Sequence, residues 1–213
     1  MTILYNFASR ERPEKFFKCL DNIQDMSESK EYFVVAKLDE DDPFAEQYKQ
    51  RIDEYPELTV RWGSSLNKVH AINRGLSGLF DYDILMNHSD DMYFTKYGFD
   101  SEVRDAFEDW DGLVHFPDQK AGSALITYAM MHKNYYESNG YVYHPAFESV
   151  YADNFQQLQA KKINKYKFVN KNILEHRHAI WGLDAKDSLL ERTENPITYE
   201  KDRQAFERLK LTL

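Results

Sequence analysis

The sequence predicts an α/β protein built on a mostly parallel sheet with helices on both faces. Over residues 2–86, apolar and β-branched segments of strand length alternate with segments of helical periodicity, in the order βαβαβαβ. Two of the strand-like segments run directly into clusters of acidic residues, at 39–42 and 90–91. Parallel strands end at one edge of their sheet, which is where ligands bind in folds of this class.

In the first half of the chain, each expected element has its own local signal. The strands are apolar, aromatic or β-branched, the helices carry apolar residues at helical spacing, and Pro13 suits the first turn of a helix. The expected elements are a strand over 2–8, a helix over 13–25, a strand over 32–38, a weak helix over 44–54, a strand over 58–62, a helix over 67–79 and a strand over 84–86.

The second half changes character, and its expected elements are shorter. Gly140 closes one helix, and Asp153 or Asn154 stands at the start of the next. No linker or repeat divides the chain, which predicts one domain. The expected elements are a helix over 98–110, a strand over 112–117, a strand-like segment over 124–131, a helix over 135–140, a helix over 153–162, strands over 167–169 and 173–178, and a closing helix over 199–209.

Composition excludes several classes of protein. The 213 residues are 42% hydrophobic and 15% aromatic, enough for a packed core. No apolar stretch is long enough to span a membrane, and the first residues lack the features of a signal peptide. A single cysteine, Cys19, excludes an internal disulfide. We therefore expect a cytoplasmic protein without integral membrane contact.

The formal net charge of −9 argues against a nucleic-acid-binding surface, because such surfaces are basic. It leaves room for a local basic pocket that holds a diphosphate. Arg10 and Arg12 follow the first strand, and Lys68 stands in the first turn of an expected helix. Arginine offers bidentate phosphate contacts, lysine a point charge, and a helix N-terminus free N–H groups. The alternative is that these residues are solvated surface charges.

The acid clusters suit two kinds of ligand. Asp90 and Asp91 follow a buried strand, and Mg²⁺ or Mn²⁺ needs only one or two protein carboxylates when phosphate and water complete its shell. Asp39 and Asp41 follow an earlier strand, where a carboxylate accepts a base N–H or ribose hydroxyls. The alternatives are a solvated turn after the strand for the first pair, and capping of the next helix by Asp41 or Asp42 for the second.

His176 and His178 stand two residues apart on an expected strand, so both imidazoles project from one face. They are candidates to complete a metal site. Zinc is not expected, because no cysteine or suitably spaced third histidine accompanies them. The alternative is a pair that packs or forms hydrogen bonds at the surface.

The order of these motifs resembles the GT-A fold glycosyltransferases that use nucleotide-diphospho-sugars, and most closely glycosyltransferase family 2. The resemblance covers residues 2–180. Its landmarks are the turn over 9–13, the acids over 39–43, the segment over 67–75 (similar to the family's Lys/Arg-x-x-Ala-x-Asn-x-Gly helix), Ser89-Asp90-Asp91 in place of the Asp-x-Asp metal motif, and a segment over 140–153 similar to the family's acceptor segment.

The resemblance implies a role for each candidate residue. Asp91 would bind Mn²⁺ or Mg²⁺, with His176 or His178 closing the shell. Asp153 would be the general base, with Glu148 in reserve and a helix N-cap as the alternative role of Asp153. The residues implied to contact the donor nucleotide or diphosphate are Ser9, Arg10, Arg12, Asp39, Asp41, Lys68 and Asp90.

The implied activity is metal-dependent, inverting transfer of one sugar to a hydroxyl of a glycan, a small molecule or, less in keeping with the acidic charge, a nucleic-acid base. The chain would divide into a nucleotide-sugar half over 1–97, an acceptor half over 98–183 and a C-terminal helical extension over 184–213. His115 and Asp118 are expected near the donor sugar. Aromatic residues over 128–147 suit an acceptor cleft, with core packing as their alternative.

The sequence departs from the family in two motifs, and two rival functions remain. The metal motif is a doubled acid, and the family's Glu-Asp is Ala152-Asp153 here. One rival is a nucleotidyltransferase that makes the sugar nucleotide, although that class opens with a glycine-rich loop and residues 9–13 contain no glycine. The other is a non-catalytic module that binds a sugar or nucleotide.

Overall fold

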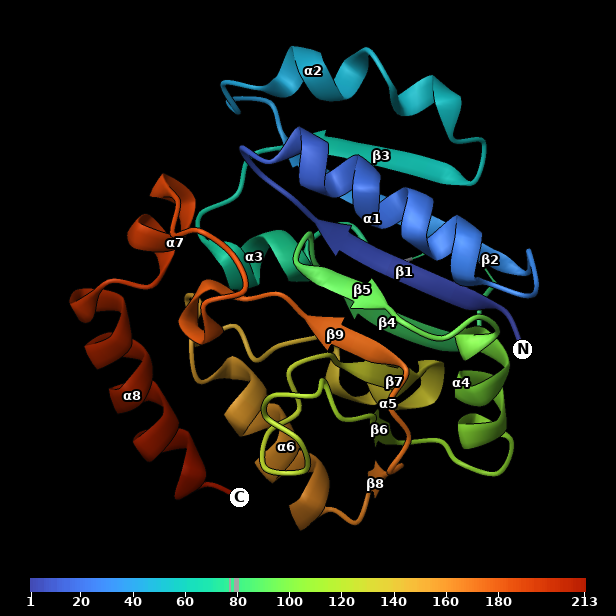
Figure 1. Ribbon diagram of the computed structural model, residues 1–213. Coiled ribbons are helices and arrows are strands. Elements are labelled where there is room, and N and C mark those ends of the chain that lie inside the picture. The colour runs from blue at the N-terminus through green and yellow to red at the C-terminus, as the bar shows by residue number, and fades with distance from the viewer. Residues whose placement is uncertain (77, 79–80) are drawn as a thin grey trace.

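A seven-stranded sheet with the order β3-β2-β1-β4-β7-β6-β8 forms the centre of the computed structural model, which describes residues 1–76, 78 and 81–213 (Figure 1). Only β7 runs antiparallel to its neighbours, so the expected mostly parallel sheet is confirmed. The strands are β1 (Ile3–Ala8), β2 (Tyr32–Asp39), β3 (Leu58–Gly63), β4 (Ile84–His88), β6 (Leu113–His115), β7 (Met130–His132) and β8 (Tyr166–Phe168).

A second, two-stranded sheet brings the late histidines to the acid pair. It consists of β5 (Met92–Phe94) and β9 (Leu174–His176), which pair antiparallel. The register sets Met92 opposite His176. Because Met92 directly follows Asp91, this pairing carries His176 to the acids at the end of β4.

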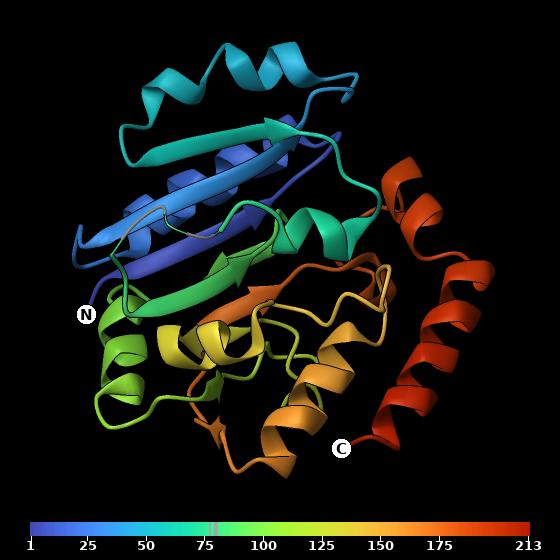
Figure 2. The same cartoon turned by 180° about the vertical axis from the view of Figure 1, so that it is seen from behind.

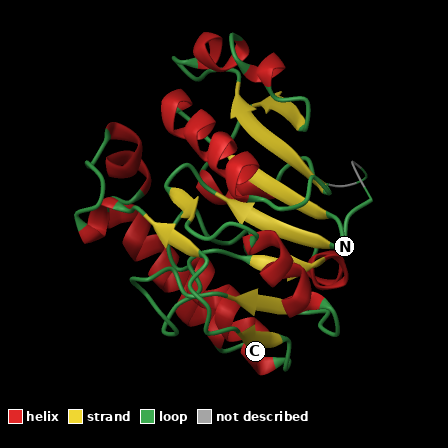
Figure 3. Ribbon diagram, turned by 45° about the vertical axis from the view of Figure 1, so that its right-hand side comes forward, coloured by secondary structure: helices red, strands yellow, loops and turns green. Residues whose placement is uncertain are grey.

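Helices cover both faces of the main sheet (Figures 1, 2 and 3), as expected for this class. One face carries α1 (Pro13–Met26) and α4 (Phe99–Phe107). The other carries α3 (Lys68–Asn73), α5 (Lys133–Asn139) and α6 (Ala152–Lys162). The remaining elements are α2 (Ala45–Lys49), η1 (Ile52–Glu54), η2 (Ala179–Trp181), α7 (Ser188–Thr193) and α8 (Pro196–Lys210).

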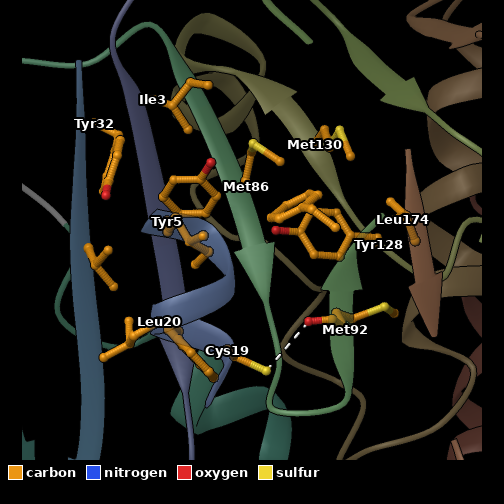
Figure 4. Close-up of a cluster of buried hydrophobic side chains, with 14 of the residues drawn as sticks. Ile3, Tyr5, Cys19, Leu20, Tyr32, Met86, Met92, Tyr128, Met130 and Leu174 are labelled. Atoms are coloured by element: carbon orange, nitrogen blue, oxygen red, sulfur yellow. Dashed lines mark hydrogen bonds between the residues drawn. The ribbon is translucent and has the colours of Figure 1, made fainter. Parts of the chain in front are cut away.

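The core fills both sides of β1. Ile3, Tyr5 and Phe7 face one apolar cluster and Leu4 faces the other, and none of the four is exposed. Figure 4 shows Tyr5 among the neighbouring side chains of the first cluster, where the Cys19 thiol donates a hydrogen bond to the Met92 carbonyl at 3.4 Å. Burial on both faces explains why β1 reads as a continuous apolar segment.

The helix expected over 67–79 is wrong in its length. Helix α3 ends at Asn73, Arg74 has extended backbone angles and Gly75 lies in the left-handed region at φ 69°. Leu79 lies outside the described residues. The early end lets the Arg74 guanidinium reach back to the Leu38 carbonyl at 2.8 Å, so a tertiary contact replaces the last helical turns.

Two other expectations need correction. The strand-like segment over 124–131 contributes only its end to β7, and Ile126 instead donates its N–H to the Gln157 side chain at 2.6 Å. Helix α6 begins at Ala152 after Tyr151, which is its N-cap residue and has φ 59° without a side-chain cap. The role of N-cap expected for Asp153 or Asn154 is therefore wrong, and Asp153 lies inside the first turn.

The C-terminal extension was only partly anticipated. The expected closing helix is α8, which Asn195 caps through hydrogen bonds from two backbone N–H groups. Helix α7 was not predicted. In both views the carboxyl ends of the parallel strands point toward α7 and α8 (Figures 1 and 2). Among the described residues, no helix has the length and apolar character required to cross a membrane.

Candidate active site

A cleft of about 870 Å³ lies at the carboxyl ends of β1, β2 and β4. Every catalytic, nucleotide-contacting and metal-binding candidate that the sequence singled out lines this cleft. Residues of α7, η2 and the start of α6 complete its walls. The candidates therefore meet at one site because the strand ends gather them there, as the parallel topology requires.

Asp90 is held rigidly at the floor of the cleft. It is buried, and Ser9 Oγ donates a hydrogen bond to its Oδ2 at 2.8 Å. Arg12 Nη1 donates to its Oδ1 at 2.8 Å, and the other edge of the same guanidinium binds both oxygens of Asp187 at 2.7 and 2.8 Å. Three of the five N–H donors of Arg12 are thus taken by carboxylates, which favours positioning of Asp90 over the expected diphosphate contact.

Asp91 faces the histidines rather than the arginines. Ser89 Oγ donates to its Oδ1, and its Oδ2 lies 3.3 Å from His176 Nε2. Burial alone would raise the pKa of Asp91, but the hydrogen bond and positive charge of His176 hold that pKa well below its usual range. The carboxylate is therefore ionised and available to a cation.

His176 lies between two carboxylates. Its Nε2 is 3.3 Å from Asp91 and its Nδ1 is 3.5 Å from Asp118 Oδ2. The edge of the Trp181 ring packs against it, with 4.9 Å between ring centroids. Burial alone would lower the pKa of His176, but the two carboxylates raise it to about 9.

Asp91, His176 and His178 fit a divalent cation. Each offers one ligand atom, and these atoms lie within 4.8 Å of one another. One carboxylate with two imidazoles suits a first-row transition metal such as Mn²⁺ better than Mg²⁺, which prefers oxygen ligands.

The two histidines are not equivalent as ligands. His178 Nδ1 accepts a hydrogen bond from the Ile180 N–H at 3.2 Å, and its Nε2 lies 3.6 Å from Glu194 Oε1. A neutral imidazole that accepts at one nitrogen carries its proton on the other. In this arrangement Nε2 of His178 is therefore a donor toward Glu194, whereas Nε2 of His176 faces Asp91.

Asp39 and Asp41 form one cluster with Arg10. Arg10 Nη1 donates to Asp39 Oδ2 at 2.9 Å and to Asp41 Oδ1 at 2.7 Å. Asp39 Oδ1 also accepts hydrogen bonds from Ser65 and Arg74. Capping of α2 by Asp41 is not observed, because Phe44 is the N-cap residue and Asp42 accepts its N–H.

The C-terminal segment places acids that the sequence reasoning missed. Glu194 Oε1 lies 3.8 Å from Lys68 Nζ and 3.6 Å from His178 Nε2, and Asp187 binds Arg12 as described above. Carboxylates of the chain itself therefore already pair with the basic side chains expected to bind the diphosphate. Asp187 before Ser-Leu-Leu is a recognisable helix-capping signal. Nothing local in the sequence, however, indicates which basic side chains Asp187 and Glu194 pair with.

Asp153 and Glu148 line the acceptor side of the cleft in different environments. Asp153 accepts the Asn154 N–H at 2.7 Å, and burial raises its pKa although Lys68 opposes the shift. The Glu148 side chain is 40% exposed and lies 3.1 Å from Lys201 Nζ. A half-buried carboxylate with a raised pKa is the better general base of the two.

Other expected site residues lie elsewhere. Within the aromatic set over 128–147, which the structure describes in full, only Tyr143 lines the cleft, and residues such as Tyr128 and Phe147 are core. His115 Nδ1 bonds the Tyr166 hydroxyl at 2.6 Å, so the expectation that His115 reaches the donor sugar is wrong. Asp118 contacts His176 instead.

Lys37 forms part of the cleft floor and is 1% exposed. Its Nζ donates to the Ile72 carbonyl at 2.5 Å, and Asn6 Nδ2 donates to the same oxygen at 3.0 Å. The two donors hold the end of α3 against β1 and β2. Burial, with the charge of Arg74, lowers the pKa of Lys37 well below its ordinary value.

We expect Lys37→Met to raise the unfolding temperature at about pH 7. The folded protein binds fewer protons at Lys37 than the unfolded chain, so wild-type stability rises with pH until about 10.4, the ordinary lysine pKa. The advantage of Lys37→Met should therefore shrink as the pH approaches about 10. Calorimetry across this pH range measures it, and a variant less stable than wild type at neutral pH would contradict the expectation.

No family model matches the sequence, and no curated protein sequence matches it. Solved structures do resemble the fold. The mannosyltransferase PcManGT from Pyrobaculum calidifontis, in complex with GDP-Man and Mn²⁺, has a TM-score of 0.64 at 14% identity over 79% of this chain and 54% of its own. TarS 1–349 from S. aureus has a TM-score of 0.64 at 12% identity over 83% of this chain and 60% of its own.

The similarity also extends to another kind of enzyme. 4-Diphosphocytidyl-2C-methyl-D-erythritol synthase from Anaerococcus prevotii has a TM-score of 0.56 at 12% identity over 79% of this chain and 86% of its own. This chain spans little more than half the length of PcManGT and TarS 1–349. These similarities show that the chain has the α/β fold of these solved structures, which is the GT-A fold expected from the sequence.

Proposed function

We propose that this protein is a metal-dependent, inverting glycosyltransferase that moves one sugar from a nucleotide-diphospho-sugar to an acceptor hydroxyl. The observation that carries the proposal is one cleft with two chemical sides: the candidate cation ligands Asp91, after β4, and His176, at the end of β9, and the half-buried carboxylate of Asp153. Transfer by inversion needs both, a charge sink for the leaving diphosphate and a base for the acceptor.

The neighbours support the donor class. PcManGT was solved with GDP-Man and Mn²⁺, and TarS 1–349 was also solved with UDP. In this chain, Lys68 and Arg10 line the cleft and would bind a diphosphate once Glu194 and Asp41 release them. Lys68 is the more available of the two, because its side chain is 46% exposed and its contact with Glu194 is long at 3.8 Å.

Asp91 and His176 would hold the cation, and His178 would join them if its Nδ1–Ile180 hydrogen bond broke. A bound divalent cation supplies Lewis-acid stabilisation of the negative charge that develops on the leaving phosphate. Asp90, fixed by Ser9 and Arg12, would face the nucleotide ribose. The donor set favours Mn²⁺.

Asp153 would act on the acceptor. Its carboxylate takes the proton of the acceptor hydroxyl as that oxygen attacks the anomeric carbon. The bond between the anomeric carbon and the diphosphate oxygen breaks, and the electron pair leaves with the nucleoside diphosphate. Burial raises the pKa of Asp153, which strengthens it as a base.

The second candidate function is nucleotidyl transfer, which the similarity to the diphosphocytidyl-methylerythritol synthase favours. The turn after β1 argues against nucleotidyl transfer. Residues 9–13 contain no glycine, and Arg12 in this turn is paired with Asp90. The acceptor expected here is a hydroxyl of a glycan or small molecule.

A thermal-shift screen tests the proposal. The purified protein is heated with UDP-, GDP-, CDP- and dTDP-sugars, each with Mn²⁺, with Mg²⁺ and with a chelator. We expect one nucleotide to stabilise the fold in a Mn²⁺-dependent way, by about 2.7 kcal/mol at a hundredfold excess over its Kd. Slow release of free sugar from that donor should follow. Pyrophosphate release from a nucleoside triphosphate and a sugar phosphate would instead establish the nucleotidyltransferase.

A further inference from the structure

We propose that Asp118 is a positioning residue for His176: it fixes the imidazole with its proton on Nδ1, so that the Nε2 lone pair faces the metal. This inference rests on the proposed metal site. It adds a residue from the loop after β6 to a site otherwise built from β4, β9 and the C-terminal segment.

Asp118 is itself immobilised by three donors. The N–H groups of Lys120 and Ala121 donate to its Oδ1 at 2.9 and 2.7 Å, and Thr127 Oγ1 donates to its Oδ2 at 2.7 Å. The residue is 1% exposed. A buried carboxylate so fully supported is a fixed acceptor, and Oδ2 is the oxygen that points at His176 Nδ1, 3.5 Å away.

His176 Nδ1 has no other use in the described part of the chain. The atom is buried and has no conventional hydrogen bond among the described residues, and Asp118 Oδ2 at 3.5 Å is the carboxylate oxygen that faces it. The loop that carries Asp118 is tied to β9 through Gln119 Nε2, which donates to the Leu174 carbonyl at 3.3 Å. Asp118 and His176 are therefore held in one rigid relation by a second contact between the same two segments.

The proton position decides whether His176 can bind a metal. Carboxylates face both nitrogens of His176. A neutral imidazole has one N–H and one lone pair. When a cation held by Asp91 takes the place of the proton on Nε2, the proton that remains is on Nδ1, where Asp118 would accept it. Nε2, which faces Asp91, is then free as a ligand. His178 shows the opposite arrangement, because its Nδ1 accepts from Ile180. Asp118 thus explains why His176 and not His178 is the primary histidine ligand.

Asp118→Asn tests the idea with little change of shape. The N–H groups of Lys120 and Ala121 require an oxygen on their side of residue 118, so the new amide must turn its NH₂ group toward His176. That group donates to Nδ1 and moves the imidazole proton to Nε2. We expect Mn²⁺ to bind about 10–100-fold more weakly, as measured by electron paramagnetic resonance or calorimetry without a donor present.

A double-mutant cycle separates positioning from mere destabilisation. If Asp118 acts through His176, Asp118→Asn should have no further effect on Mn²⁺ affinity in a His176→Ala background. Asp100→Asn is the matched control, since Asp100 is also 1% exposed and accepts two backbone N–H groups, from Glu28 and Ser29, away from the cleft. Its Mn²⁺ affinity should equal that of wild type.

The wild-type protein gives an answer that does not depend on the variant folding. In heteronuclear NMR of the cadmium-loaded protein, we expect the metal to couple to Nε2 of His176 and the proton to reside on Nδ1. Coupling to Nδ1, or wild-type Mn²⁺ affinity in a folded Asp118→Asn variant, would overturn the inference. A wild-type protein that binds no divalent cation would instead overturn the metal site in the proposed function.

Discussion

Replacing Asp91 by alanine is expected to abolish metal-dependent sugar transfer while leaving the protein folded. Asp91 is the only carboxylate in the candidate ligand set, so its loss leaves two imidazoles, a poor site for Mn²⁺. The Lewis-acid contribution of a bound metal is several kcal/mol, and about 4 kcal/mol corresponds to a roughly thousandfold loss of kcat. Transfer assays with the cognate donor, together with Mn²⁺ binding by calorimetry, measure both consequences.

Asp81→Ala is the control for this variant, because Asp81 is fully exposed and pairs only with Lys133 among its described contacts. It should keep wild-type turnover. Wild-type turnover of a folded Asp91→Ala protein with saturating Mn²⁺ would refute the metal assignment.

The same substitution has a pH signature in the metal-free protein. The pKa of His176 is raised to about 9, and Asp91 is one of the two carboxylates responsible. A raised histidine pKa stabilises the fold fully below about pH 6.5, the unfolded value, and this contribution disappears as the pH rises through about 9. The stability lost in Asp91→Ala should therefore be largest in mild acid and should fade in alkali.

Local sequence determined the strands of the fold well. β1, β2 and β4 are apolar segments buried on both faces. Each strand ends at or just before acidic or turn-forming residues, so its end could be predicted from the sequence. The helix expected over 67–79 failed for a reason outside its own sequence. Arg74 leaves helical geometry to bind the Leu38 carbonyl and Asp39, and no periodicity within the segment encodes that contact.

Only the part of the candidate site that lies at the ends of the strands could be predicted from the sequence. Asp91 and Asp39 could be placed at one edge because parallel topology gathers strand ends. The partners of these residues could not be read from the chain. Arg12 is drawn to Asp90 and Asp187, and His176 to Asp118, through contacts between segments far apart in sequence. Such contacts depend on β5 and β9 pairing and on where α7 lies.

The fold alone does not decide the reaction. The mannosyltransferase PcManGT, TarS 1–349 and a diphosphocytidyl-methylerythritol synthase all resemble this chain at 12–14% identity. Function lies in the site carried by the fold. The feature that a nucleotidyltransferase would not require is the half-buried acid Asp153 in the cleft, and it therefore provides the sharper test.

Replacing Asp153 by asparagine is expected to leave donor binding intact and to lower kcat by about 10²–10⁴-fold, the usual contribution of a general base. The amide keeps the size of the side chain and its acceptor for the Asn154 N–H, so the first turn of α6 should persist. Donor affinity is measured by calorimetry and turnover by product release. Glu148→Gln is the matched control on the same wall of the cleft, and we expect it to change kcat by less than about twofold because Lys201 and solvent already occupy Glu148.

The pH profile makes the assignment of the base specific. A general base must be ionised, so kcat/KM should fall in acid as Asp153 takes up a proton. Burial raises the pKa of Asp153, which places this decline above the pH at which an ordinary aspartate titrates. Asp153→Asn should retain only residual activity without that acid limb, whereas Glu148→Gln should keep the limb unchanged. Full activity in Asp153→Asn together with loss of the limb in Glu148→Gln would transfer the role of base to Glu148.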